Sequence, residues 1–393
     1  TDSHSPYVYD YFSETLRERQ SFNQEFRAVS DSADFQKNIF FEWVIGTSYL
    51  ELKESNLKKD DGLYGDPSDP YGPYASASSS SSKYKSSNFS VFGNLDYLLS
   101  ASLKFSIGLR WEDWEADYAD SLQESFNPTD KMSGGKISLI KNMTNGTNMY
   151  ASLAKGYKQG GFNLGLGLDA NSRNKNLAYD PEFLTNYELG INTKLLDSRI
   201  TFNGVLFYSD REDQQVLIST QTDPSDPNTF SFLTQNAAEG VNHGLEINMD
   251  MDINEFLSAF VNLGILKTEI KNWQSRQDLE GRAQAHAPER SYALGLNWTP
   301  TSHTYLAIDF TGKSSFYYSD SHNNKSKSYV LTNLNLGYVK NNWNYELWAR
   351  NIFDEYYSVR GFYFGNEAPN FIDTLYKRHG DPRHIGLSIR YDF

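Results

Sequence analysis

The chain contains no cysteine and no long apolar run, and it has 36 basic against 50 acidic residues. Without cysteine there are no disulfides and no thiolate metal sites. No stretch approaches the ~18 apolar residues of a spanning helix, which excludes a helical membrane protein. The net charge of −14 argues against nucleic acid as a partner, because phosphate binding needs concentrated Lys and Arg.

No signal peptide is recognisable at the start of the chain. The opening TDSHSPYVYDYF has no basic region followed by an apolar one. Either the protein stays inside the cell, or its N-terminus lies upstream of Thr1.

Aromatic residues are abundant, with 27 Tyr, 25 Phe and 7 Trp in 393 residues, although the mean hydropathy is −0.62. This combination is typical of a β-sheet that has one apolar face and one polar face. The closing RHIGLSIRYDF shows strict alternation that ends on Phe393, with apolar side chains on one face and polar ones on the other. The last strand of a soluble sandwich would look the same, so this stretch alone does not decide the class.

About fifteen segments along the chain alternate in this way, and no comparable stretch has a 3.6-residue period. The predicted strands are 20–30, 38–53, 86–98, 102–116, 132–142, 147–160, 182–195, 198–208, 239–252, 255–272, 288–298, 302–316, 326–340, 342–352 and 382–393.

The connections between these strands alternate between short and long. Short turns such as LLSAS, NMTNG and LLDSR are followed by long connections such as 54–85, 117–131 and 353–381. In an up-and-down sheet, all short turns then lie at one end and all long loops at the other. Short periplasmic turns and long extracellular loops are typical of a transmembrane β-barrel. The Ser-rich connection 54–85 and the connection 353–381 are accordingly predicted to be extracellular loops.

Side-chain pattern supports an all-β, antiparallel, up-and-down transmembrane barrel over a soluble sandwich. In SLKFSIGLRW, Leu103 to Trp111 alternate with Lys104 to Arg110, so one face suits lipid and the other a wet lumen. Aromatic residues gather at strand ends, as the two belts of a membrane barrel do. Those at the short turns are Tyr97, Tyr150, Trp298, Tyr305, Tyr338, Trp343 and Phe393, and those at the other end are Trp111, Trp114, Tyr157 and Tyr208.

Strand parity places residues 1–19 on the long-loop side, as the remnant of an extracellular loop. Single-chain bacterial barrels have an even number of strands. An odd count that begins outside therefore predicts at least one further strand ahead of Thr1, so that 1–393 is one N-terminally incomplete barrel domain.

Five stretches, taken together and in order, resemble the TonB-dependent outer-membrane receptors of Gram-negative bacteria. They are FNQEFRAVS (22–30) with VIGTSYLE (44–51), NMYASLAKGYKQGGFN (148–163), NYELGINTKLLDSRITFNGVLFYSDREDQQV (186–216), WARNIFDEYY (348–357) and GDPRHIGLSIRYDF (380–393). The resemblance implies a 22-strand barrel that is filled by an N-terminal plug. The fifteen strands would be roughly the eighth to the twenty-second, without the plug or the segment that binds TonB.

The resemblance also implies partners and a place in the cell. The chain would be an integral protein of the outer membrane, in contact with lipid and lipopolysaccharide, and would couple to TonB through the missing N-terminal part. The barrel assembly machinery would read the terminal strand through Phe393, Tyr391 and Ile389. The cargo would be a small-molecule nutrient, with ferric siderophores or other iron complexes favoured over carbohydrate, haem or cobalamin.

Nothing in the sequence resembles an active site, a metal site or a cofactor site, so no enzymatic activity is predicted. His379 and His384 lie across a turn and are read as solvated, and GYKQGG lacks the Lys-Ser/Thr of a phosphate loop. By family analogy, substrate would bind where loops meet the upper lumen. The candidate residues are Tyr157, Lys158, Gln159, Phe162 and Asn163 at the top of one strand, and Gln214, Gln215, Arg360, Tyr363 and Tyr376 in two long loops.

The predicted function is capture of a scarce nutrient and its import with TonB-coupled energy. The loops mix both charge signs, whereas anionic siderophores would suit a basic rim, and their Tyr and Asn content leans slightly towards a neutral polar ligand. Two rivals remain open at this stage. One is a plugless passive pore, and the other is an adhesin or phage-attachment barrel that uses its long loops.

Overall fold

The computed structural model describes residues 8–65, 72, 74–121, 125–144, 146–163, 178–221, 230–273, 276–320, 322–364, 372 and 374–393. Within these residues, fifteen long strands form one antiparallel sheet in which each strand pairs with the next along the chain. They are β1 (Val8–Val29), β2 (Phe41–Gly65), β3 (Tyr74–Ser100), β4 (Leu103–Asp120), β6 (Thr129–Asn142), β7 (Asn148–Lys158), β10 (Glu182–Leu195), β11 (Ile200–Gln221), β12 (Phe230–Asn254), β13 (Leu257–Asn272), β14 (Arg290–Thr301), β15 (Thr304–Lys313), β16 (Tyr329–Lys340), β17 (Trp343–Arg350) and β20 (His384–Tyr391).

The remaining elements are short and lie in the connections. β5 (Ser125–Phe126) extends the main sheet beside β4, whereas β8 (Gly161–Phe162) pairs with β9 (Ala178–Tyr179), and β18 (Ser358–Phe364) pairs with β19 (Thr374–His379). Within the described residues, two 3-10 turns span Phe35–Lys37 (η1) and Gln277–Leu279 (η3). No helix in the described ranges is long and apolar enough to cross a membrane.

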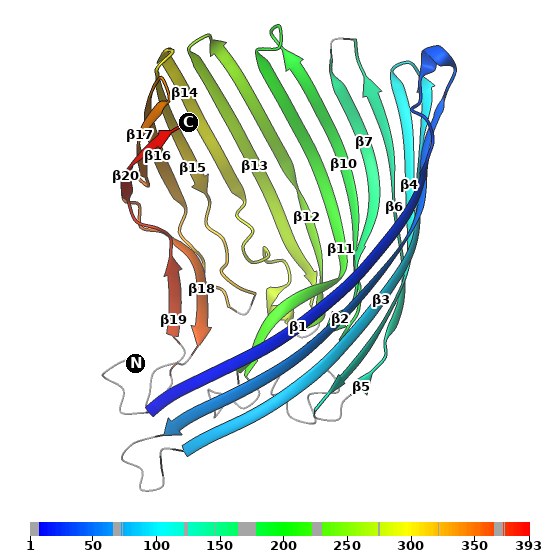
Figure 1. Cartoon of the computed structure of the whole chain (residues 1–393), viewed down its shortest axis with the longest axis vertical. Helices are drawn as coiled ribbons and strands as arrows, with labels where there is room; N and C mark the ends of the chain where they lie inside the picture. The colour runs from blue at the N-terminus through cyan, green and yellow to red at the C-terminus, as the bar shows by residue number, and fades with distance from the viewer. Residues whose placement is uncertain are drawn as a thin grey trace.

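The sheet curves into the wall of a barrel, and the short turns between its successive strands lie at one end (Figure 1). We call this the short-turn end and the opposite one the long-loop end. The described part of β1 pairs with β2, and that of β20 pairs with β17, so these two strands form the edges of the sheet. Each predicted strand corresponds to one strand of the sheet, in order, which confirms the antiparallel up-and-down fold.

Two segments that we predicted as loops are mostly strand. Residues 8–19 lie in β1, and residues 54–65 and 74–85 continue β2 and β3 towards the long-loop end. Polar cross-strand contacts hold this extension, such as the Arg19 guanidinium to the Glu54 carboxylate at 2.8 Å and the Ser13 hydroxyl to Asp60 at 2.7 Å. Most positions on both faces are polar here, with exceptions such as Phe12 and Leu16, so the alternation that marks a strand in sequence is weak although the backbone pairing continues.

The outer face of the sheet is apolar and solvent-accessible over a broad band. Leu109, Leu189 and Leu387 are about three-fifths exposed, with values of 64%, 59% and 64%. Aromatic side chains border the band: Tyr187 lies against Tyr208 towards the long-loop end, and Trp343 lies against Tyr391 at the short-turn end. Trp114, Tyr150 and Tyr305, which we assigned to the belts, instead point to the inner face, where Trp114 is buried and the Tyr305 hydroxyl donates to Glu346.

The clusters of buried hydrophobic side chains lie at the long-loop end rather than in the middle of the wall. One cluster contains Trp114, Ala116 and Met132, a second contains Ile270, Trp273 and Leu279, and a third contains Phe316, Tyr318 and Tyr329. Each lies where a connection folds back over strand ends. The connections are therefore packed against the sheet and present fixed surfaces.

Close packing of tyrosine over glycine on the inner face predicts a sensitive position. A Cβ added at Gly337 would lie 1.9 Å from the Tyr305 ring, so Gly337→Val must displace the ring and break its bond to Glu346. Overpacking of this kind costs about 1–3 kcal/mol. We expect the free energy of unfolding, measured by denaturant titration of the protein in lipid vesicles, to fall by this amount.

The matched control is Gly156→Ala, because a Cβ at Gly156 meets no atom within 4 Å. It should leave the unfolding midpoint nearly unchanged. Equal effects of the two substitutions would contradict the packing assigned to Tyr305.

Candidate functional site

The segment Gly-Tyr-Lys-Gln-Gly-Gly-Phe-Asn (156–163) leaves β7 at the long-loop end and is tied to the strands on both sides. The Tyr157 hydroxyl donates to the Glu112 carboxylate at 3.0 Å. The Arg110 guanidinium donates to the same carboxylate oxygen at 2.8 Å, and the Asn88 amide donates to the other oxygen. Glu112, although buried, is thus fully engaged by β3, β4 and β7.

Side-chain amides connect this segment to the next pair of strands. The Gln215 amide donates to the backbone carbonyls of Gln159 and Asp180, at 2.9 and 3.0 Å. The Asn236 amide donates to the carbonyls of Asp180 and Asp213, at 2.8 Å each. These side-chain amides take the place of backbone-to-backbone hydrogen bonds, which the connections lack where they leave the sheet. They thereby hold the connections in one conformation.

Phe162 and Asn163 also serve the local structure. The Phe162 ring stacks on Tyr118 at 5.5 Å and packs against the cluster of Trp114 and Met132. The buried Asn163 side chain makes two bonds of 2.7 Å with the backbone of Thr234, donating to its carbonyl and accepting from its N–H. These contacts join residues that lie 71 positions apart.

Lys158 and Gln214 are placed differently from their neighbours. Lys158 is the exposed last residue of β7, opposite Glu182 of β10. Gln214 lies in an irregular stretch of β11 opposite Ala238, next to Asp213, whose φ is 53°. The structure therefore brings Tyr157, Gln159 and Gln215 into one network and leaves these two residues at its margin.

The other three candidates lie on the β18–β19 hairpin, at the long-loop end beneath β20 (Figure 1). Arg360 is directly opposite Arg378, and Phe362 is opposite Tyr376. Because side chains two positions apart share a face, these four lie on one face, where the Phe362 and Tyr376 rings stack at 5.7 Å. We call this the basic-aromatic face. Tyr363 is on the reverse side, where its ring lies 5.3 Å from that of His322.

Arg282 holds the neighbouring connections together, although no pattern in the sequence distinguishes it from other arginines. Its buried guanidinium pairs with Asp320 at 2.7 Å and donates to the carbonyls of Ser319 and His322. The Tyr317 ring accepts cation–π contacts from Arg282 at 4.3 Å and from Lys325 at 4.1 Å. Its partners come from a later connection, so spacing in the sequence carries no signal for this role.

Burial lowers the pKa of His322 below its ordinary value of 6.5, and the positive charge of Arg282 lowers it further. The Nδ1 atom of His322 accepts a bond from the backbone N–H of Asn324 at 3.2 Å, which requires an unprotonated nitrogen. The neutral ring thus stabilises the connection between β15 and β16.

The described residues contain no group of three or more His, Asp or Glu side chains placed to hold a metal ion. The terminal strand ends in an exposed aromatic pair, with the rings of Tyr391 and Phe393 5.0 Å apart, and Ile389 is also exposed. Tyr391 lies against Trp343 of β17, on the outer face.

The fold and this end of the molecule define a barrel wall with an apolar outer face, a polar inner face and ordered connections at one end. The family model for the TonB-dependent receptor-like β-barrel matches residues 1–352. The chain therefore belongs to the TonB-dependent receptor β-barrel family, a family of receptors and transporters.

Solved structures of similar fold agree with this assignment. The ferric yersiniabactin uptake receptor FyuA from Yersinia pestis superposes with a TM-score of 0.73 at 20% identity, over 98% of this chain and 55% of that one. The siderophore receptor PiuA from Acinetobacter baumannii gives 0.71 at 16% identity, over 96% and 56%. The copper transporter OprC gives 0.71 at 12% identity, over 97% and 58%. The chain thus spans little more than half the length of these proteins.

We expect the stability of the Arg282 and His322 region to fall in acid. On acidification the unfolded chain binds a proton near pH 6.5, whereas the folded His322 does so only at lower pH. The stabilisation is therefore complete above pH 6.5 and is lost as the pH falls from 6.5 towards the folded-state pKa. Hydrogen exchange of residues 282–325, corrected for intrinsic rates, should show weaker protection at pH 5 than at pH 7.5.

His322→Gln should remove most of this pH dependence, whereas His303→Gln, in an exposed short turn, should preserve it. An unchanged pH profile in the His322 variant would show that another group controls this region.

Proposed function

We propose that the chain forms most of the barrel wall of an outer-membrane receptor that captures an iron complex outside the cell and imports it with TonB-coupled energy. Family membership supports the general class, and the basic-aromatic face supports the cargo. On this proposal the long-loop end is extracellular and the short turns are periplasmic. The connections 353–381 and 54–85, the latter largely strand, then stand on the outside of the cell.

The proposed cargo class depends mainly on the basic-aromatic face. Arg360 and Arg378 are exposed and directly opposite one another, and neither forms an ion pair within the described part of the chain. Two like charges in this position repel each other unless an anion lies between them. The stacked Phe362 and Tyr376 rings beside them suit flat aromatic groups. An anionic ferric complex with aromatic ligands would satisfy both features.

The other candidate residues fit a supporting role in this function. Five of them join strand ends to connections at the long-loop end, where cargo would enter the barrel: Tyr157, Gln159, Phe162, Asn163 and Gln215. Lys158 and Gln214, at the margin of that network, remain candidates for contact with cargo. We propose in addition that TonB acts through a segment outside this chain, and that the exposed end of β20 is read by the barrel assembly machinery.

Equilibrium binding of ferric complexes to the purified receptor tests the cargo. The double substitution Arg360→Ala with Arg378→Ala removes two charge-assisted contacts, each worth about 1.5–3 kcal/mol. We expect the affinity for an anionic aromatic complex, measured by fluorescence quenching, to fall by at least about a hundredfold.

Lys141→Ala with Lys340→Ala is the charge-matched control, because these residues lie at the short-turn end of β6 and β16. It should leave the affinity unchanged. Tight binding of a neutral complex that is insensitive to the arginine pair would contradict the proposed cargo class, without bearing on membership of the family.

A further inference from the structure

A groove of about 1080 Å³ runs along the outer face of β2, β3, β4 and β6. Its floor is made of small residues that replace the large side chains of the surrounding band, namely Gly93, Ser133 and Gly135. A Cβ at Gly135 would lie 2.6 Å from the backbone carbonyl oxygen of Gly108, so a larger side chain there would force the wall to move. The groove is thus a feature of the backbone, not a chance gap between rotamers.

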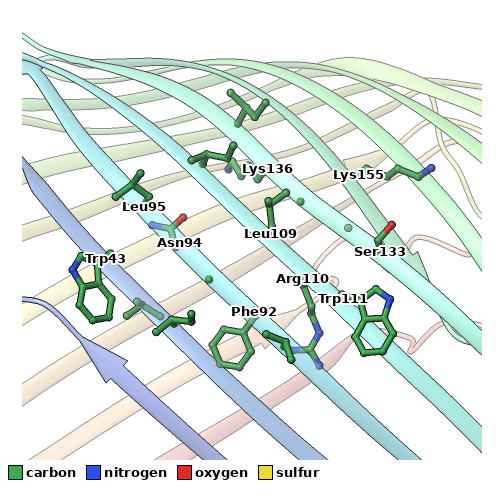
Figure 2. A pocket seen from close by; sticks show the side chains of 18 of the residues that line it. Trp43, Phe92, Asn94, Leu95, Leu109, Arg110, Trp111, Ser133, Lys136 and Lys155 are labelled. Atoms are coloured by element: carbon green, nitrogen blue, oxygen red, sulfur yellow. The ribbon is translucent and has the colours of Figure 1, made fainter.

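The sides of the groove are large apolar side chains. Figure 2 shows Trp43, Leu95, Leu109 and Trp111 lining it, with strands of the opposite wall behind. Leu109 is 64% exposed and Trp111 is 41% exposed, so no part of the described chain covers them. A surface of this shape in the apolar band is complementary to hydrocarbon chains.

Of the three cations beside the groove, Lys155 is the one on the outer face, because Arg110 and Lys136 occupy alternate positions that face inward and Arg110 pairs with Glu112. Lys155 alternates with Leu153 on the outer face of β7, opposite Gly135 of β6 and Thr185 of β10. Its ammonium lies 5.3 Å from the centre of the Phe183 ring, and it forms no ion pair with any described residue. Lys131, the next cation on this face, lies directly opposite Asp113.

The depth of Lys155 indicates what it meets in a membrane. Leu153 and its partner Tyr187 lie one step towards the apolar band, and aromatic residues such as Tyr187 mark the level of the lipid headgroups. A lysine at this level directs its ammonium towards the headgroup phosphates. Each such cation contributes about 1 kcal/mol to the binding of anionic lipid.

We propose that this groove is a site for one phosphate-bearing membrane lipid, whose acyl chains fill the channel over Gly93, Ser133 and Gly135 and whose phosphate pairs with Lys155. The lipid belongs to the leaflet at the long-loop end. This proposal rests on the outer-membrane location in the proposed function. It is independent of the cargo, because the groove lies on the outer face of the wall and cargo would pass along the inner face.

Native mass spectrometry of the receptor purified from its outer membrane tests the site. Diphosphorylated lipid A is added at increasing concentration, and the lipid-bound fraction is compared among variants. Lys155→Ala should weaken binding about fivefold, the factor that corresponds to about 1 kcal/mol. Ser133→Phe should reduce it as well, because the new ring occupies the channel, where Ser133 is exposed opposite Trp111.

The matched control is Lys267→Ala, which removes an exposed lysine on the outer face of β13, where it lies opposite His243 of β12 and away from the groove. This variant should bind as the unmodified protein does, and dephosphorylated lipid should bind the unmodified protein as weakly as lipid A binds Lys155→Ala. Equal binding by Lys155→Ala, or equal losses in Lys155→Ala and Lys267→Ala, would overturn the proposal. Normal ferric-complex binding in all three variants would show that the site is separate from the cargo site.

Discussion

The continuous antiparallel ladder from β1 to β17 and β20 is the constraint on which the rest of the structure depends. In the hydrocarbon interior of a bilayer every backbone N–H and C=O group must find a partner within the protein. The ladder meets this requirement, and pairing leaves the side chains free to differ completely between the two faces. An apolar outer face and a polar inner face therefore follow from one repeated pattern.

The same backbone pairing continues into the long-loop end, although the side chains there change from mainly apolar to mainly polar. Beyond the apolar band, polar cross-strand contacts such as Arg19–Glu54 and Ser13–Asp60 replace the apolar side chains of the outer face. The connections then fold back, and buried hubs such as Glu112 and Arg282 fix them. The basic-aromatic face is built on two paired strands, so its charges and rings are held in place before a ligand arrives, which lowers the entropic cost of binding.

Sequence reasoning predicted the fifteen strands because alternation is a local signal wherever one face meets lipid and the other meets water. It missed residues 8–19 and the strand extensions within 54–85, because polar residues occupy most positions there and weaken the alternation. It also wrongly assigned Tyr150 and Tyr305 to the aromatic belts. Their distance in sequence from a turn shows how near they lie to a strand end, but not whether they point to the outer or the inner face of the sheet.

The candidate site was predictable to a smaller extent. The stretch 156–163 was recognised by its resemblance, but its chief role in the structure is to join strands through Glu112, Gln215 and Thr234. Such contacts depend on the register of strands that are far apart in sequence. The pairing of Arg360 with Arg378 likewise becomes visible only when the hairpin is formed, because a gap of 18 residues carries no local signal.

The central claim is energised import, and cellular uptake tests it most directly. Cells that express the intact receptor would be given a radiolabelled ferric complex, with and without a functional TonB, and in the presence of an excess of the unlabelled complex. The account predicts saturable uptake that disappears in the absence of TonB, while surface binding is retained. Unsaturable uptake that persists without TonB would contradict it and would indicate a passive pore.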